Sequence, residues 1–107
     1  MATESLFQNK RVTVFGLGQN MGGVGTVIYL AEHGAREIIV TDTKTREELA
    51  APLAKLTSYK NITYVLGQHR PEDFTRVDMV IKNPAIPWTN EYVKLAEAHH
   101  IPVEMDS

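Results

Sequence analysis

The sequence predicts an α/β fold: a single domain built on a doubly wound, five-stranded parallel sheet. Five short apolar runs are separated by segments with helical or turn patterns. The runs are apolar throughout, which is typical of strands covered on both faces of a parallel sheet. The first run ends in a glycine-rich turn that leads directly into a helical pattern, as in a βαβ unit. Ligands in such folds bind at the carboxyl ends of the strands, so candidate site residues are sought in the loops that follow them.

The first half of the pattern is a strand, a helix and a second strand. Arg11–Phe15 is a β-rich run that ends at a glycine. Gly22–His33 has apolar residues at helical spacing, and Gly34 stands where a helix commonly ends in a left-handed residue. Glu37–Thr41 is the second strand, and Asp42 follows it directly.

The next segment contains two conflicting signals. Thr45 and Glu48 have the spacing of a capping box, and three leucines follow on one helical face: Leu49, Leu53 and Leu56. Pro52 lies inside this segment, lacks an N–H group and disfavours helical geometry at the residue before it. We therefore expect either a kinked helix or a helix that begins at Pro52.

The remaining elements complete the alternation. Ile62–Leu66 is predicted as the third strand and Pro71–Phe74 as one helical turn. Met79–Ile81 is the fourth strand, ending at Lys82. A helix capped by Thr89 or Asn90 then runs to about His99, and Ile101–Glu104 is the fifth strand.

Length and composition further restrict the class of protein to which this chain can belong. The chain has 107 residues, of which 43% are hydrophobic and 22% charged, so we expect one packed core and no extended disorder. The formal net charge of −2 argues against nucleic acid as a partner. We expect no membrane span and no signal peptide, because no apolar run has the required length. The lack of cysteine excludes disulfides and thiolate chemistry and is compatible with the cytoplasm.

The glycine-rich turn is the first candidate site. Gly16 and Gly18 begin a GxG pattern, but Met21 stands where the third glycine of the usual fingerprint is expected, and the next two residues are glycines. Backbone N–H groups at the start of the following helix can bind a diphosphate. The candidate residues are Gly18, Gln19, Asn20 and Gly22. The alternative is a tight turn with no ligand.

The second candidate site follows the second strand. Asp42 lies 20 residues after Gly22 (42 − 22 = 20), where an acidic residue that binds a ribose hydroxyl or a base N–H is expected. The alternative is that Asp42 only stabilises a turn or caps the next segment. Thr43 and Lys44 extend the same edge.

The third candidate site is the loop after the fourth strand. Two prolines within four residues stiffen this loop, which suits the wall of a ligand site. Lys82 is a candidate for contact with phosphate and Asn83 for contact with sugar or base, whereas the alternative is a plain turn. His69 follows the third strand at the same rim, with a weaker case for a direct role. No serine–histidine–acid set, carboxylate pair or metal-ligand cluster stands out, so we expect no catalytic and no metal-binding residue here.

An ordered set of motifs also resembles a known family. The segments are VTVFGLG, LAEHGA, IIVTDTK, VLGQHRPEDF, DMVIKNPAIP and AEAHHIPVEMD, which together span about Lys10 to Asp106. They resemble the N-terminal domain of Mur ligases, in particular the MurD type. The GLG turn alone has little specificity, whereas the whole set in this order is much more specific.

The resemblance implies a Rossmann-like domain, here residues 1–107, that binds UDP-N-acetylmuramoyl-L-alanine through its UDP part. It implies that Gln19 and Asn20 contact the diphosphate and that Asp42, Thr43 and Lys44 hold the uracil. It also implies that Asn83, Pro84 and Ala85 line the nucleotide in place of a Ser-Pro-Gly segment. This chain departs from the family in an extra residue in the first loop, in Asn-Pro-Ala, and in Lys44 where an arginine is usual.

The resemblance further implies a cytoplasmic enzyme with three domains. Such a ligase activates a carboxylate with ATP, and D-glutamate then attacks the acyl phosphate to form an amide. This chain has no GxxxxGK[ST] loop, so ATP and Mg²⁺ are expected in a central domain that this fragment lacks. The partners expected are the UDP-N-acetylmuramoyl peptide substrate and the missing central and C-terminal domains. The fragment alone is expected to bind and not to catalyse.

Two other classes remain open at this point. GxG with an acidic residue after the second strand is also the signature of an NAD(H)-binding domain of a dehydrogenase or regulatory protein. The irregular third glycine and the KNPAIP loop favour the UDP-binding interpretation. A structural α/β module without a ligand is the third possibility.

Overall fold

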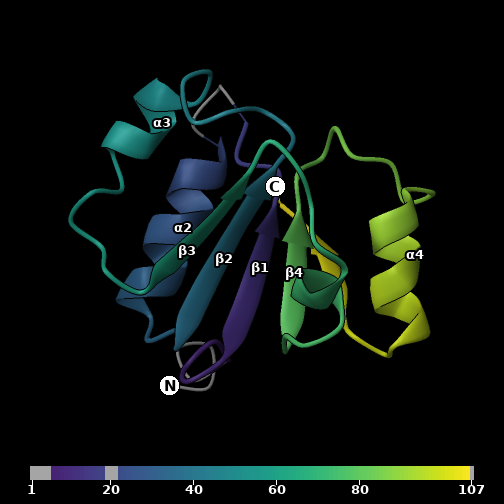
Figure 1. Cartoon of the computed structure of the whole chain (residues 1–107). Helices are drawn as coiled ribbons and strands as arrows, with labels where there is room; N and C mark the ends of the chain where they lie inside the picture. The colour runs from purple at the N-terminus through teal and green to yellow at the C-terminus, as the bar shows by residue number, and fades with distance from the viewer. Residues whose placement is uncertain (1–5, 19–21, 107) are drawn as a thin grey trace.

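The predicted strands form one all-parallel sheet. The computed structural model describes residues 6–18 and 22–106. The strands pair in the order β3-β2-β1-β4-β5 (Figure 1). Their bounds are β1 Arg11–Phe15, β2 Glu37–Asp42, β3 Ile62–Leu66, β4 Met79–Lys82 and β5 Val103–Met105. The predicted five-stranded parallel sheet is thus confirmed.

Helices cover both faces of this sheet, which confirms the doubly wound arrangement. On one face, α2 (Gly22–Glu32) and α3 (Ala50–Ala54) pack on alternate strand residues such as Val14. On the other face, the 3₁₀ turn η1 (Pro71–Phe74) and α4 (Glu91–Ala98) pack on their neighbours in the strands, such as Phe15 (Figure 1). Because both sides of each central strand are buried, most residues of these strands are apolar, with a few buried polar residues such as Thr13.

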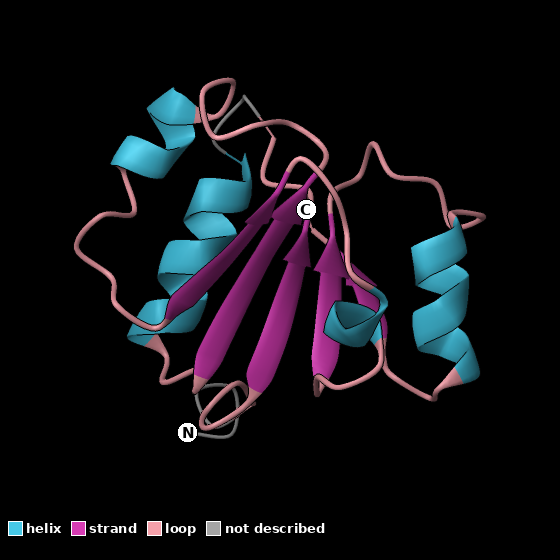
Figure 2. Cartoon of the chain, viewed as in Figure 1, coloured by secondary structure: helices cyan, strands magenta, loops and turns pink. Residues whose placement is uncertain are grey.

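The strand order places the switch point between β1 and β4. From β1 the chain moves outward through β2 and β3, and then returns to add β4 and β5 on the opposite side. The strands point toward the same edge of the sheet, so their carboxyl ends and the loops that follow gather there (Figure 2). This edge is where a ligand site is expected in a doubly wound sheet.

The segment after β2 differs from both expectations for it. The capping box forms, because Glu48 N–H donates to Thr45 Oγ1 at 3.2 Å and Thr45 N–H donates to Glu48 Oε1 at 2.9 Å. It closes a turn, however, and α3 begins only at Ala50. Pro52 is the third residue of α3, where a backbone N–H has no helical partner in any case, so it neither starts nor kinks the helix.

The elements near the C-terminus are shifted by one or two residues. Asn90 is the cap of α4, because its side chain accepts hydrogen bonds from two backbone N–H groups of the first turn. β5 begins at Val103 rather than at Ile101, since Pro102 has no N–H and takes part only through its carbonyl, which accepts from Val80 N at 2.9 Å. Among the helices of the described ranges, none has both the length and the apolar character needed to cross a membrane.

Candidate functional site

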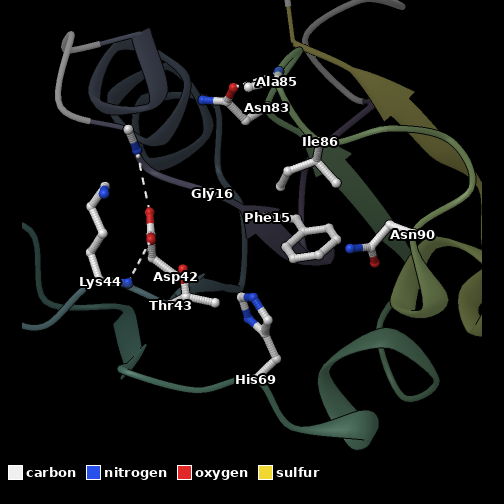
Figure 3. Close-up of a pocket in the computed structure, with 11 residues that line it drawn as sticks. Phe15, Gly16, Asp42, Thr43, Lys44, His69, Asn83, Ala85, Ile86 and Asn90 are labelled. Atoms are coloured by element: carbon white, nitrogen blue, oxygen red, sulfur yellow. Dashed lines mark hydrogen bonds between the residues drawn. The ribbon is translucent and has the colours of Figure 1, made fainter.

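A pocket of about 320 Å³ lies at the carboxyl edge of the sheet, at the switch point. It is open to solvent and draws its walls from the loops after four strands (Figure 3). The lining residues are Phe15, Gly16, Gly18, Asp42, Thr43, Lys44, His69, Asn83, Ala85, Ile86 and Asn90. The pocket therefore lies where the parallel sheet predicts a ligand.

Two glycines let the first loop pack against the loop after β4. Gly16 and Gly18 have φ angles of +90° and +76°, a region that residues with a Cβ rarely adopt. A Cβ on Gly16 would lie 3.0 Å from Asn83 Cβ and 3.0 Å from Ile86 Cδ1. The glycines thus serve the construction of the pocket wall as well as any approach of a ligand.

The irregular glycine spacing is explained by Gly23. A Cβ at Gly23 would lie 2.3 Å from the backbone oxygen of Leu17, whereas a Cβ at Gly22 would have no atom within 4 Å. Close packing of helix against strand is the usual task of the third glycine in the fingerprint. Gly23 performs a comparable task here, since it lets α2 pack on Leu17 of the loop after β1, and the sequence did not show which of the two neighbouring glycines would.

Asp42 is buried, and its carboxylate braces the first loop: it accepts backbone hydrogen bonds that hold the loop in place. Its Oδ2 accepts from Leu17 N at 2.9 Å and from Gly18 N at 3.4 Å, and its Oδ1 accepts from Lys44 N at 2.9 Å (Figure 3). The turn role weighed from sequence is therefore present. A carboxylate has about four acceptor sites, so roughly one remains for a ligand. The contact of Asp42 with a ligand stays a prediction.

Lys82 is a structural residue of the fourth-strand loop, not a group that lines the pocket. Its side chain is 1% exposed, and its ammonium donates to the Ile86 carbonyl at 2.7 Å. The same ammonium lies 4.5 Å from the centre of the Trp88 ring, a cation–π contact. These contacts hold the loop in place, so the expected phosphate contact of Lys82 does not fit this geometry. Trp88 is 46% exposed and is the aromatic partner of Lys82.

His69 stands in the pocket wall within an aromatic cluster. Its Nδ1 makes a 2.6 Å hydrogen bond with Thr41 Oγ1, and its ring lies edge-on to Phe15 and Tyr92 at centroid distances of 4.8 and 5.2 Å. Burial lowers the pKa of His69 below its usual value, and the charges of Asp42 and Asp73 oppose that shift. The imidazole is therefore held in its neutral form near pH 7.

The lowered pKa of His69 predicts a loss of stability in mild acid. Below pH 6.5 the unfolded chain binds a proton that the folded chain resists, so the free energy of unfolding falls as the pH decreases from 7 to 5. Urea unfolding at several pH values measures this slope. The slope should be smaller in His69→Gln than in the wild type. Equal slopes in the two proteins would contradict the assignment.

Six of the predicted site residues meet in this pocket: Gly18, Asp42, Thr43, Lys44, Asn83 and Ala85. Pro84 does not line it, and Gly22 lines a separate shallow hollow beside α2. Gln19 and Asn20 lie outside the described residues. The sequence reading missed Phe15, Ile86 and Asn90 as lining residues, because their patterns indicated only a strand, a loop and a helix cap.

Fold and pocket together define a Rossmann-like domain with a ligand-sized site at the switch point of its sheet. A solved S-adenosylmethionine dependent methyltransferase from Mesorhizobium loti shares the fold, with a TM-score of 0.61 and 18% identity over 92% of this chain and 43% of that one. The family described as "Mur ligase MurD-like, N-terminal domain" matches residues 10–104. The chain belongs to this family, as the resemblance of the motifs predicted.

Similar proteins point to the same family. The chain is 42% identical over 91 residues to the UDP-N-acetylmuramoylalanine–D-glutamate ligase of Borreliella afzelii, and 40% identical over 97 residues to that of Roseiflexus sp.. These matches cover 84% and 91% of this chain but 20% of each relative. A third match, from Treponema pallidum, is 39% identical over 103 residues and covers 19% of that protein. The chain thus spans about one fifth of the length of these relatives.

Proposed function

We propose that this chain is the part of a D-glutamate-adding ligase that binds the UDP moiety of UDP-N-acetylmuramoyl-L-alanine. The observation that carries the proposal is the pocket at the switch point. It gathers Thr43 and Lys44 from the loop after β2, and Asn83 and Ala85 from the loop after β4, around the glycine turn of β1. The family match and the names of the similar proteins support this choice of ligand.

The chemistry of the pocket suits a nucleoside diphosphate. The positive end of the α2 helix dipole is proposed to attract the diphosphate. Lys44 adds a cation at the rim (Figure 3). Thr43 and Asp42 are the groups proposed for the uracil and ribose. These features support a binding mode in which the diphosphate lies near α2 and the nucleoside lies along the pocket.

Catalysis is proposed to need the rest of the ligase. The sequence has no GxxxxGK[ST] segment, so residues that would hold ATP and Mg²⁺ are not among those of this chain. When bound elsewhere in such an enzyme, ATP supplies the phosphoryl group that activates the substrate carboxylate. The role of this chain's own residues is to hold the nucleotide end of the substrate in a fixed position.

The brace role of Asp42 argues against the NAD(H) alternative. A dinucleotide-binding acidic residue grips the ribose through its carboxylate. Here that carboxylate already accepts three backbone N–H bonds, from Leu17, Gly18 and Lys44. A two-point grip on ribose hydroxyls would require about one of these bonds to break or be shared, whereas a single contact with a base or hydroxyl would not.

A titration followed by ¹⁵N NMR tests the proposed function. UDP-N-acetylmuramoyl-L-alanine is expected to shift the amide signals of Gly18, Thr43 and Lys44, and NADH is expected to shift them less at equal concentration. The amides of α3, which lies away from the pocket lining, serve as the internal control. Tighter binding of NADH would support the dehydrogenase-type alternative, and no shift with either ligand would indicate a structural module.

A further inference from the structure

We propose that Asn90 is a specificity-determining residue of the pocket, whose side-chain amide donates a hydrogen bond to the 4-carbonyl oxygen of the uracil base of the ligand. The proposal rests on the proposed function, because it assigns the base of the UDP moiety to a particular end of the same pocket. In the sequence, Asn90 has the pattern of a helix cap and nothing more.

The cap itself fixes the orientation of the amide. Asn90 Oδ1 accepts from Tyr92 N at 2.8 Å and from Val93 N at 3.3 Å. Because an asparagine side chain has one oxygen and one nitrogen, these two bonds turn the amide nitrogen away from α4. Figure 3 shows this nitrogen on the side of Asn90 that faces Phe15, and Asn90 lines the pocket. Within residues 6–18 and 22–106 the nitrogen has no hydrogen-bond acceptor.

The surroundings of Asn90 suit a flat heterocycle. Ile86 supplies apolar surface beside it, and the Phe15 and His69 rings, edge-on to one another, also line the pocket, with Phe15 only 1% exposed. Figure 3 shows Thr43 on the side of Phe15 opposite Asn90, so polar side chains stand at both ends of this part of the pocket. Apolar faces with polar groups at the edges match a nucleobase better than a sugar, which carries hydroxyl groups over its whole surface.

The position of the diphosphate leaves this end of the pocket for the base. The start of α2 lies on one face of the sheet, and Phe15 with α4 lies on the other. A nucleotide whose diphosphate is at α2 must pass over the sheet edge to fill the remaining part of the pocket. The base then arrives beside Phe15 and Asn90. An N–H donor at that point favours uracil, which has a carbonyl where cytosine has an amino group.

Two substitutions test the proposed hydrogen-bond donor of Asn90 separately from its role as the cap of α4. Serine and aspartate cap helices about as well as asparagine, so Asn90→Ser and Asn90→Asp should keep the melting temperature of the chain. Asn90→Ser withdraws the donor from the pocket, because the serine hydroxyl ends one bond closer to the backbone than the asparagine amide nitrogen, and we expect UDP to bind about tenfold more weakly, the value of one hydrogen bond. Asn90→Asp replaces the donor with an acceptor, so the preference for UDP over CDP should fall by about tenfold or more.

The experiment is an NMR or calorimetric titration of the chain and both variants with UDP and with CDP. The proposal holds if the wild type prefers UDP and the two variants lose that preference while they stay folded. Binding of UDP and CDP with wild-type affinity by both variants overturns it and leaves the proposed function intact, because Asn90 is then a cap only. A wild type that binds neither nucleotide overturns the proposed function and this inference together. If serine lowers the stability, Asn90→Asp alone decides the outcome.

Discussion

Gly23→Ala is expected to lower the free energy of unfolding by about 3 kcal/mol, the upper end of the usual cost of overpacking. The added Cβ would lie 2.3 Å from the Leu17 oxygen and 2.8 Å from Leu17 Cα. These are backbone atoms, so no side-chain rotation can relieve the contact. For a domain of this size the melting temperature should fall by about 12–24 °C. Thermal unfolding followed by circular dichroism measures the change.

Gly25→Ala is the matched control in the same helix. A Cβ at Gly25 would have no atom within 4 Å, and alanine favours helix over glycine by about 0.5–1 kcal/mol. This variant should therefore be slightly more stable than the wild type, the opposite sign from Gly23→Ala. If both variants change stability in the same direction, the assignment of Gly23 as the packing glycine is wrong.

Asp42→Ala is expected to cost about 3 kcal/mol of stability and also to weaken the binding of UDP by about 1–3 kcal/mol. The stability cost arises because the buried N–H of Leu17 and the N–H groups of Gly18 and Lys44 lose their acceptor. The binding cost arises because the glycine turn loses its brace and because a ligand would lose a contact with the carboxylate. Urea unfolding measures the first cost, and titration at a temperature where the variant is folded measures the second.

Asp42→Asn separates the two roles of this residue. An asparagine keeps one carbonyl oxygen, so it can retain either the bond to Leu17 or the bond to Lys44, and its stability should lie between those of the wild type and the alanine variant. A folded Asp42→Asn protein with wild-type affinity for UDP would remove the carboxylate from the list of ligand contacts. An Asp42→Ala protein as stable as the wild type would contradict the claim that the Asp42 carboxylate stabilises the first loop.

Local sequence patterns were sufficient to predict the strands. Runs such as Arg11–Phe15 and Ile62–Leu66 are both the predicted and the observed strands, because each is short, apolar and β-branched. Prediction was weaker where the chain turns. The Thr45–Glu48 capping box is a local hydrogen-bonded unit that can close a turn as well as begin a helix, and only the packing of Leu53 and Leu56 on the sheet decides where α3 forms.

The sequence by itself determined that this chain is a parallel α/β domain of the Mur ligase type, with its candidate ligand groups in the loops that follow the strands. It did so because hydrophobic periodicity, glycine spacing and motif order are properties of neighbouring residues. The tertiary structure alone decided that Gly23 packs on Leu17, that Lys82 is occupied by Ile86 and Trp88, and that the amide of Asn90 faces the pocket. The contacts of Gly23 and Lys82 lie within single loops and depend on how each loop bends, whereas the position of Asn90 in the pocket wall exists only after the loops meet at one edge of the sheet.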